Sequence, residues 1–232
     1  MFEAVETISR VKPVSGRRLA IVATGGSLAM LAADQLQRQG GLLAEPQPDT
    51  AAALAASQRP GHPTSNPLCL CETAGAEAYA QAAGALLADR NVDAVLAVVA
   101  PSAFTSLEAA ADALANVDAT GGSTHHRRKP LLVALTAGAP LPRKSLDRVR
   151  IPCHGSGSEA VRAFMHLVRY ADGRDMLMAA PPSLPADFQP NAEAARDVVR
   201  AALSRGQEGL TPPETGTSLA AYGTAQGEAR PA

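Results

Sequence analysis

Apolar runs alternate with amphipathic stretches along most of this chain. The runs predict six strands, at 19–23, 42–45, 68–70, 92–100, 131–135 and 150–153. Apolar positions spaced three or four residues apart predict helices between and after them, at 1–10, 28–36, 49–56, 74–88, 106–117, 158–170 and 191–204. Where a helix is expected after the fifth strand, the segment 139–148 has a poor helical pattern. Strands that alternate with helices in this way predict an α/β fold, a parallel sheet with helices on both faces.

The same pattern divides the chain into three parts. Residues 1–18 are predicted to form an N-terminal helix and a linker, and residues 19–172 the α/β domain. Residues 173–232 are expected to form a Pro-rich linker, one helix and a tail whose last ten or so residues are disordered, because apolar residues are scarce there.

Composition narrows the class of protein. Hydrophobic residues make up 46% of the 232 residues and aromatic residues only 3%, which predicts an aliphatic core. A net charge of −1 gives no electrostatic reason to expect nucleic-acid or membrane binding. The N-terminus carries acidic residues and no apolar signal segment, and three cysteines suit a reducing compartment. We therefore expect a cytoplasmic protein.

The turn after the first strand is the best candidate for a binding site. Gly25 and Gly26 leave the backbone bare, and Ser27 is expected to cap the helix that follows. A helix that begins this way directs N–H groups and a positive dipole end toward an anion. The spacing matches neither the dinucleotide-binding glycine motif nor a P-loop, so a tight turn without a ligand remains the alternative. In parallel sheets, loops at the carboxyl ends of strands gather at one edge, here including 100–106 and 136–139.

Cysteine and basic side chains offer weaker candidates. Cys69 and Cys71, with His62 or Cys153, match no zinc-binding spacing, and buried strand cysteines are the better interpretation. The basic run 125–129 is interpreted as a solvated loop. We predict no metal site.

Serine and histidine candidates for catalysis lie near the last strand. The segment 155–158, Gly-Ser-Gly-Ser, lacks the strong preceding strand of a nucleophile elbow and is interpreted as a helix N-cap loop. His154 could act as a base or phosphate carrier, but the sequence supplies no carboxylate to orient it. We assign no catalytic residue.

Several motifs, in order along the chain, resemble one family. These motifs are RRLAIVATGGSLAMLAADQLQRQGG, SNPL at 65–68, YAQAAGALLADRNVDAVLAVVAPSAFTS, RKPLLVAL, RIPCHGSGSEAVRAFMHLVRY and the tail from APPSLPADF to AAYG. They resemble the flavodoxin-like CoA-ligase domain of NDP-forming acyl-CoA synthetases. That family includes ADP-forming acetyl-CoA synthetases, succinyl-CoA synthetases and lysine acetyltransferases fused to the same region. The resemblance implies a flavodoxin-like fold for 19–172 and, for 173–232, the lead-in to an ATP-grasp domain.

The resemblance also implies a site and its partners. In that family the first helix directs its N-terminus at a phosphohistidine during phosphoryl transfer, which implies anion binding at Gly25, Gly26 and Ser27. Asn66, Pro101 and Ser102 fall on the neighbouring loops. A complete assembly would use CoA and ADP or ATP with Mg²⁺, supplied through Rossmann CoA-binding and ATP-grasp domains or chains. We expect this chain alone to carry no such domain, no shuttle histidine and no cofactor.

Three departures from the family pattern weaken the analogy. Leu28 stands where a further glycine is usual, Cys69 replaces an aspartate, and the segment 139–142 is Ala-Pro-Leu-Pro. Two hypotheses follow. The chain is a ligase domain or subunit of an acyl-CoA synthetase of the acetate–CoA ligase type, incomplete alone. Alternatively, it is a non-catalytic module, either a decayed fragment or a regulatory or metabolite-binding domain.

Overall fold

The computed structural model describes residues 7–11, 14–58, 64–120, 129–136, 141–179 and 189–224. The chain divides into two compact units, Met1–Met178 and Ala179–Ala232.

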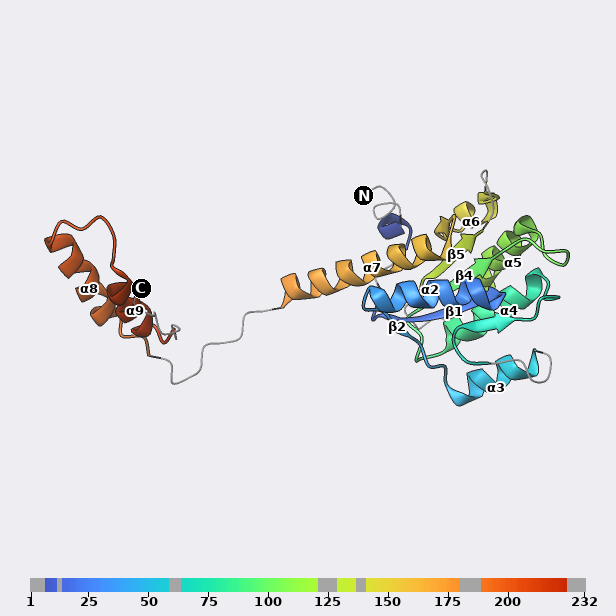
Figure 1. Cartoon of the computed structure of the whole chain (residues 1–232), viewed down its shortest axis with the longest axis horizontal. Coiled ribbons are helices and arrows are strands. Elements are labelled where there is room, and N and C mark those ends of the chain that lie inside the picture. The colour runs from blue at the N-terminus through green and yellow to red at the C-terminus, as the bar shows by residue number, and fades with distance from the viewer. Residues whose placement is uncertain are drawn as a thin grey trace. The chain divides into compact units, whose positions relative to one another are not determined.

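Unit 1 is an alternating α/β unit (Figure 1). Its strands are β1 Arg18–Thr24, β2 Leu42–Leu43, β3 Leu68–Leu70, β4 Ala94–Val99, β5 Leu131–Leu135 and β6 Cys153–His154. Its helices are α2 Gly26–Arg38, α3 Pro48–Ala56, α4 Ala76–Ala88, α5 Leu107–Thr120, α6 Lys144–Arg148 and α7 Gly157–Met178. Residues 7–10 add a short helical segment.

All strand pairs are parallel, and the order is β2-β1-β4-β5-β6 with β3 also paired to β1. β2 pairs with Arg18 and Leu19 at the start of β1, and β3 pairs with 22–24 at its end. Because β4 occupies the other side of β1, β2 and β3 share one place in the sheet. With that pair counted as one strand, the order is flavodoxin-like, which confirms the predicted fold class.

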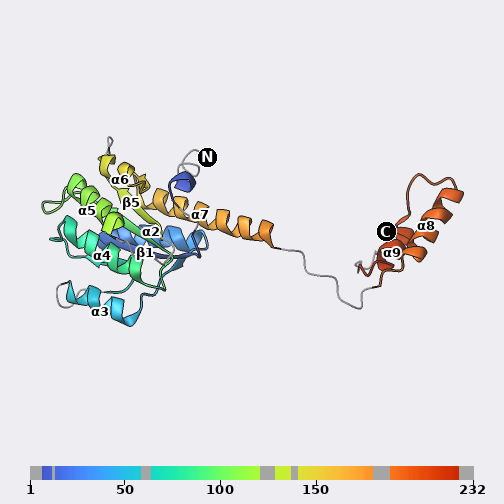
Figure 2. The ribbon, with the colours of Figure 1, turned by 180° about the vertical axis from the view of Figure 1, so that it is seen from behind.

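The sheet separates two apolar layers. Alternate β1 residues, such as Leu19 and Ile21, face α2 and α7, while Ala20 and Val22 face the layer of α3 to α6. Figure 2 shows α4 and α5 side by side, packed against the sheet. Both layers consist mainly of Ala, Val and Leu, as the composition predicts. Because the strands are buried on both faces, they are continuous apolar runs rather than alternating ones.

Several element boundaries differ from the prediction. The last strand of the sheet begins at Cys153 rather than 150, because 149–151 close the short helix α6 by backbone bonds to its last turn. The helix predicted to end at 117 continues to Thr120, and α7 continues to Met178 instead of ending at 170. On α2, the buried residues are Ala29, Ala32, Ala33 and Leu36, whereas Leu31 is 62% exposed. Residues 1–6 of the predicted N-terminal helix and residues 125–128 of the basic run lie outside the described residues.

Unit 2 is a pair of helices, α8 Ala192–Ser204 and α9 Pro212–Ala220. The prediction of a single helix in this region was wrong. Thr211 caps α9 with Glu214 in a reciprocal capping box, and two prolines occupy its first turn, where a missing N–H costs nothing. Asn191 accepts a hydrogen bond from the Ala194 N–H at 3.0 Å and so caps α8. The last residues, 225–232, lie outside the described part of the chain.

Candidate functional site

The carboxyl edge of the sheet contains the candidate site. After β1 the chain passes to β2 and β3 on one side, and it returns to β4 on the other. The loops after β1 and β4 therefore flank the position where the strand order reverses. Ligands of open α/β sheets bind at such a position, outside the carboxyl ends of the strands. The predicted residues Gly25–Ser27 and Pro101–Ser102 lie on these two loops.

The first turn of α2 is exposed and uncapped. Gly25 is the N-cap residue with φ 85°, a backbone conformation that favours glycine. Ser27 lies inside the helix, so the prediction that it caps α2 was wrong, and no described side chain accepts a hydrogen bond at this cap. The first turn also carries no acidic residue among the described positions. Its N–H groups and positive dipole end therefore remain available to an anion.

A second helix that begins at this edge after a glycine turn, α7, is capped internally. The Glu159 N–H donates to Oγ of Ser156 at 3.2 Å, and the Glu159 carboxylate accepts from the Gly155 N–H at 3.0 Å. This pattern confirms the predicted N-cap loop at 155–158. A carboxylate already occupies the positive end of α7, which leaves α2 as the open helix end of the two.

α2 projects past α7 at this edge. A Cβ added to Gly157, the first residue of α7, would lie 3.3 Å from Cβ of Ala32, so the two helices are in close contact there. Ala32 lies six residues after Gly26, which is about 9 Å along a helix axis. The first turns of α2 thus extend beyond the start of α7, and Met30 and Leu31 are each 62% exposed on them.

A buried tyrosine lies directly beneath the glycine turn. The hydroxyl of Tyr79, on α4, accepts the Thr24 N–H at 3.1 Å and lies 2.7 Å from Oγ1 of Thr24. It also donates to the Val98 carbonyl at 3.4 Å. Burial raises the pKa of Tyr79, and the hydrogen bonds with Thr24 offset only part of that effect. The sequence analysis missed this residue, and its place on a predicted helix gave no signal of its role.

The second loop of the site is ordered by its own side chains. Oγ of Ser102 accepts the N–H groups of Phe104 and Thr105, at 3.1 and 3.2 Å. The Thr105 hydroxyl donates to the Ala74 carbonyl at 2.7 Å, which ties this loop to the one before α4. Pro101 and Ser102 are exposed. Ser102 thus folds the loop, while its side chain remains near solvent.

Asn66 has a structural role. Its Oδ1 accepts the Ile21 N–H at 2.9 Å, and its Nδ2 donates to the carbonyls of Leu19 and Ala44 at 2.8 and 2.9 Å. The side chain fills the gap between β2 and β3 and completes the hydrogen bonding of β1. Because all these contacts point into the sheet, Asn66 supports β1 rather than facing a ligand.

The remaining candidate side chains lie apart from the glycine turn. The register of the sheet aligns His154 on β6 with Ala23 on β1. Because β4 and β5 lie between these two strands, the two positions are about 14 Å apart at ordinary strand spacing. No disulfide joins the three cysteines, all of which lie in the described segments. Cys69 and Cys71 are half-buried rather than buried, and Cys153 is buried. His62 lies outside the described residues.

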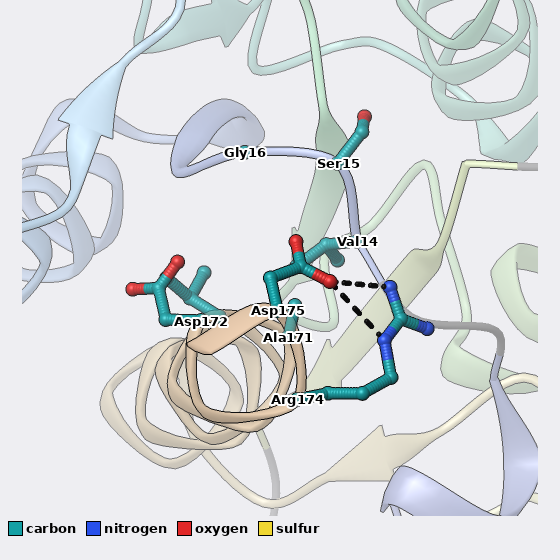
Figure 3. A pocket seen from close by; sticks show the side chains of 8 residues that line it. Val14, Ser15, Gly16, Ala171, Asp172, Arg174 and Asp175 are labelled. Carbon is teal, nitrogen blue, oxygen red and sulfur yellow. Dashed lines mark hydrogen bonds and ion pairs between the residues drawn. The ribbon is translucent and has the colours of Figure 1, made fainter. Parts of the chain in front are cut away.

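A small pocket of about 100 Å³ lies at the opposite, amino end of β1 (Figure 3). It is bounded by the segment 14–16 and the later turns of α7. The Arg174 guanidinium pairs with Asp175 at 3.0 Å beside it, and Asp172 pairs with Arg17 at the same distance. Each charged group that lines the pocket is thus part of an ion pair, and the pocket lies apart from the glycine turn.

A network of ion pairs and hydrogen bonds lies at the same amino edge of the sheet. The Arg18 guanidinium donates to both carboxylate oxygens of Asp93, at 2.9 and 3.0 Å, and the Arg18 N–H adds a third bond at 2.9 Å. Burial would raise the pKa of Asp93, but the hydrogen bonds and charge of Arg18, with the charge of Lys129, lower it overall. Burial likewise opposes ionisation of Asp89, yet its hydrogen bonds and Lys129 lower that pKa. These groups stabilise the fold far from the candidate site.

Among the described residues, no helix is long and apolar enough to cross a membrane. No group of three potential metal-binding side chains occurs in the described ranges either.

No protein-family model matches the chain, but several solved structures share its fold. PH0766 from Pyrococcus horikoshii is 24% identical with a TM-score of 0.66, over 74% of this chain and 40% of that one. A dinucleotide-forming acetyl-coenzyme A synthetase 1 from Ca. Korarchaeum cryptofilum is 22% identical with a TM-score of 0.68, over 78% of this chain and 39% of that one. The structure of that synthetase is solved both in the apo form and in complex with phosphate and ADP. This chain thus spans about two fifths of the length of these proteins and shares the α/β fold of the matched part.

Proposed function

We propose that this chain is the ligase domain or subunit of an NDP-forming acyl-CoA synthetase of the acetate–CoA ligase type, incomplete alone. The observation that carries the proposal is the open N-terminus of α2, exposed and uncapped at the reversal point of the strand order. The similarity of fold to an acetyl-coenzyme A synthetase solved with phosphate and ADP supports it.

The contribution of this chain to the reaction would be electrostatic. A phosphoryl group in transfer carries negative charge on its outer oxygens, and catalysis consists mainly of positioning it and stabilising that charge. The N–H groups of Gly26 and Ser27 and the dipole of α2 can meet one or more of those oxygens. The space beside Gly25 and Gly26 is open, since a Cβ built at either position would meet nothing within 4 Å.

The other parts of the site would come from partners. Rossmann CoA-binding and ATP-grasp domains or chains would bring CoA, ADP or ATP with Mg²⁺, and the histidine that carries the phosphoryl group. The projecting first turns of α2, with Met30 and Leu31 exposed, would supply apolar contact area beside the anion position. The overall reaction would convert acyl-CoA, NDP and phosphate to the acid, CoA and NTP, or the reverse.

Reconstitution tests the proposal. The chain is mixed with CoA-binding and ATP-grasp chains from the same source, and ATP formation from acetyl-CoA, ADP and phosphate is measured. We expect ATP formation to require this chain and to be lost in Ser27→Asp but kept in Ser27→Asn. The Asp variant places a negatively charged carboxylate at the N-terminus of α2. The Asn variant introduces a side chain of the same size without the charge, so the comparison isolates the effect of charge. Equal ATP formation by both variants would refute the proposed role of α2. Phosphate binding without ATP formation would favour a metabolite-binding module.

A further inference from the structure

The hydroxyl of Tyr79 lies where β1 ends and the glycine turn begins. Its ring is fully buried on α4, in the layer opposite α2, so the hydroxyl reaches the turn from beneath the sheet. We propose that Tyr79 is a positioning residue, which sets the direction of the glycine turn through Thr24. The positioning role itself does not depend on the proposed function. Only its consequence, that the positioned turn binds an anion at α2, rests on that function.

The ladder leaves Thr24 without a partner from β4. The register between β1 and β4 ends at the pair Ala23 and Val98, one residue before Thr24. In place of a β4 backbone acceptor, the Tyr79 hydroxyl accepts the Thr24 N–H at 3.1 Å. A part-buried N–H that loses its acceptor is costly, so this bond restrains the last peptide before Gly25.

The second contact restrains the side chain of the same residue. Oγ1 of Thr24 lies 2.7 Å from the Tyr79 oxygen, a short distance for two hydroxyls. Two bonds to one residue, one to its backbone and one to its side chain, fix both its position and its orientation. The weaker bond to the Val98 carbonyl, at 3.4 Å, anchors the hydroxyl to β4. Through these bonds, the sheet and α4 fix the position from which the chain turns at Gly25, whose φ is 85°.

Tyrosine also suits a position beside an anion. A phenolate would repel a phosphate oxygen and could no longer donate to Val98. Burial raises the pKa of Tyr79, so the hydroxyl remains neutral and keeps both its donor and acceptor roles at physiological pH.

The test compares five variants. Tyr79→Phe keeps the ring and removes both bonds to Thr24, whereas Thr24→Val removes only the hydroxyl bond and Thr24→Ser preserves both. Tyr170→Phe makes the same substitution at an exposed tyrosine on α7. For each protein, NMR hydrogen exchange of the 24–27 amides and the Kd for inorganic phosphate are measured. Leu86→Ala, in the core of the same helix, controls for a general loss of stability.

We expect Tyr79→Phe to accelerate exchange at Thr24 and to shift the Gly25 and Gly26 signals. We also expect phosphate Kd to rise about fivefold, the effect of losing one or two ordinary hydrogen bonds. Thr24→Val should show a smaller effect, and Thr24→Ser and both controls none.

Unchanged 24–26 amides in Tyr79→Phe, or a Leu86→Ala effect of the same size, would overturn the inference. An unchanged phosphate Kd in a wild-type protein that binds phosphate would also overturn it. If the wild-type chain binds no phosphate but the amides respond as expected, the proposed function fails and the positioning role of Tyr79 stands.

Discussion

A few polar side chains complete the backbone hydrogen bonding of a mostly aliphatic sheet. Asn66 satisfies three backbone groups of β1 and the segment after β2, and Tyr79 satisfies another at the end of β1. Sequence analysis placed Asn66 near the site only through a family resemblance. Its actual contacts depend on how three chain segments meet, which no local pattern records.

Removal of the Asn66 amide should destabilise unit 1. Asn66→Ala leaves the Ile21 N–H and two carbonyls without their partner, so we expect a loss of about 3 kcal/mol in the free energy of unfolding. Asn66→Asp should cost at least as much, because a carboxylate oxygen would face the Leu19 and Ala44 carbonyls. Urea unfolding measures both, with the exposed Ser65→Ala as control. A loss below 1 kcal/mol in both variants would contradict the assigned contacts.

The Arg18–Asp93 pair predicts a pH-dependent stability. The pKa of Asp93 is lowered in the folded protein, so the pair stabilises fully above the unfolded value of about 4. That contribution is lost as the pH falls through the folded pKa. Asp93→Asn should therefore be less stable than wild type by about 2 kcal/mol at pH 7, and the difference should shrink below pH 4. Unfolding at a series of pH values measures it, and a constant difference would contradict the assignment.

At the scale of elements, capping distinguishes the helices at the carboxyl edge. α7 carries its own carboxylate at its N-terminus, and α2 begins with bare glycines. The sequence predicted both turns but placed the cap of α2 at Ser27, two residues too late. Side-chain type alone favoured Ser27, whereas the positive φ of Gly25 determines where the helix begins.

The end of α6 offers a direct test of backbone strain. Arg150 has φ 63°, a left-handed conformation that costs a side-chain-bearing residue about 1–2 kcal/mol. Its exposed hydrogen bond to the Ser9 carbonyl, at 3.3 Å, returns little of that cost. We expect Arg150→Gly to raise the free energy of unfolding by about 0.5–1 kcal/mol.

The matched control is Arg148→Gly, at the last residue of α6, which should lower stability by about 0.5–1 kcal/mol. Thermal unfolding of the two variants beside the wild type checks both signs. A destabilising effect of Arg150→Gly equal to that of Arg148→Gly would show that position 150 carries no strain.

At the scale of the whole molecule, the sequence predicted the fold class because strands buried on both faces are continuous apolar runs between helices. Three strands central to the topology, β1, β4 and β5, were found close to their actual bounds. The missed helix α9 contains proline, glycine and threonine, which disfavour a helix interior, although the Thr211–Glu214 capping box that begins it is a local sequence signature. The site was predicted from its glycines, but the buried hydroxyl beneath it required the three-dimensional structure.

The central claim is that the open end of α2 binds an anion, and phosphate-dependent thermal unfolding tests it most directly. Wild type, Ser27→Asn and Ser27→Asp are compared in potassium phosphate and in potassium chloride of equal ionic strength. Phosphate at 100 times its Kd should stabilise the first two by about 2.7 kcal/mol. Ser27→Asp should gain nothing from phosphate, although without phosphate it should be at least as stable as wild type, because its carboxylate meets the helix dipole. A wild type that phosphate does not stabilise, or an equal gain in Ser27→Asp, would contradict the claim.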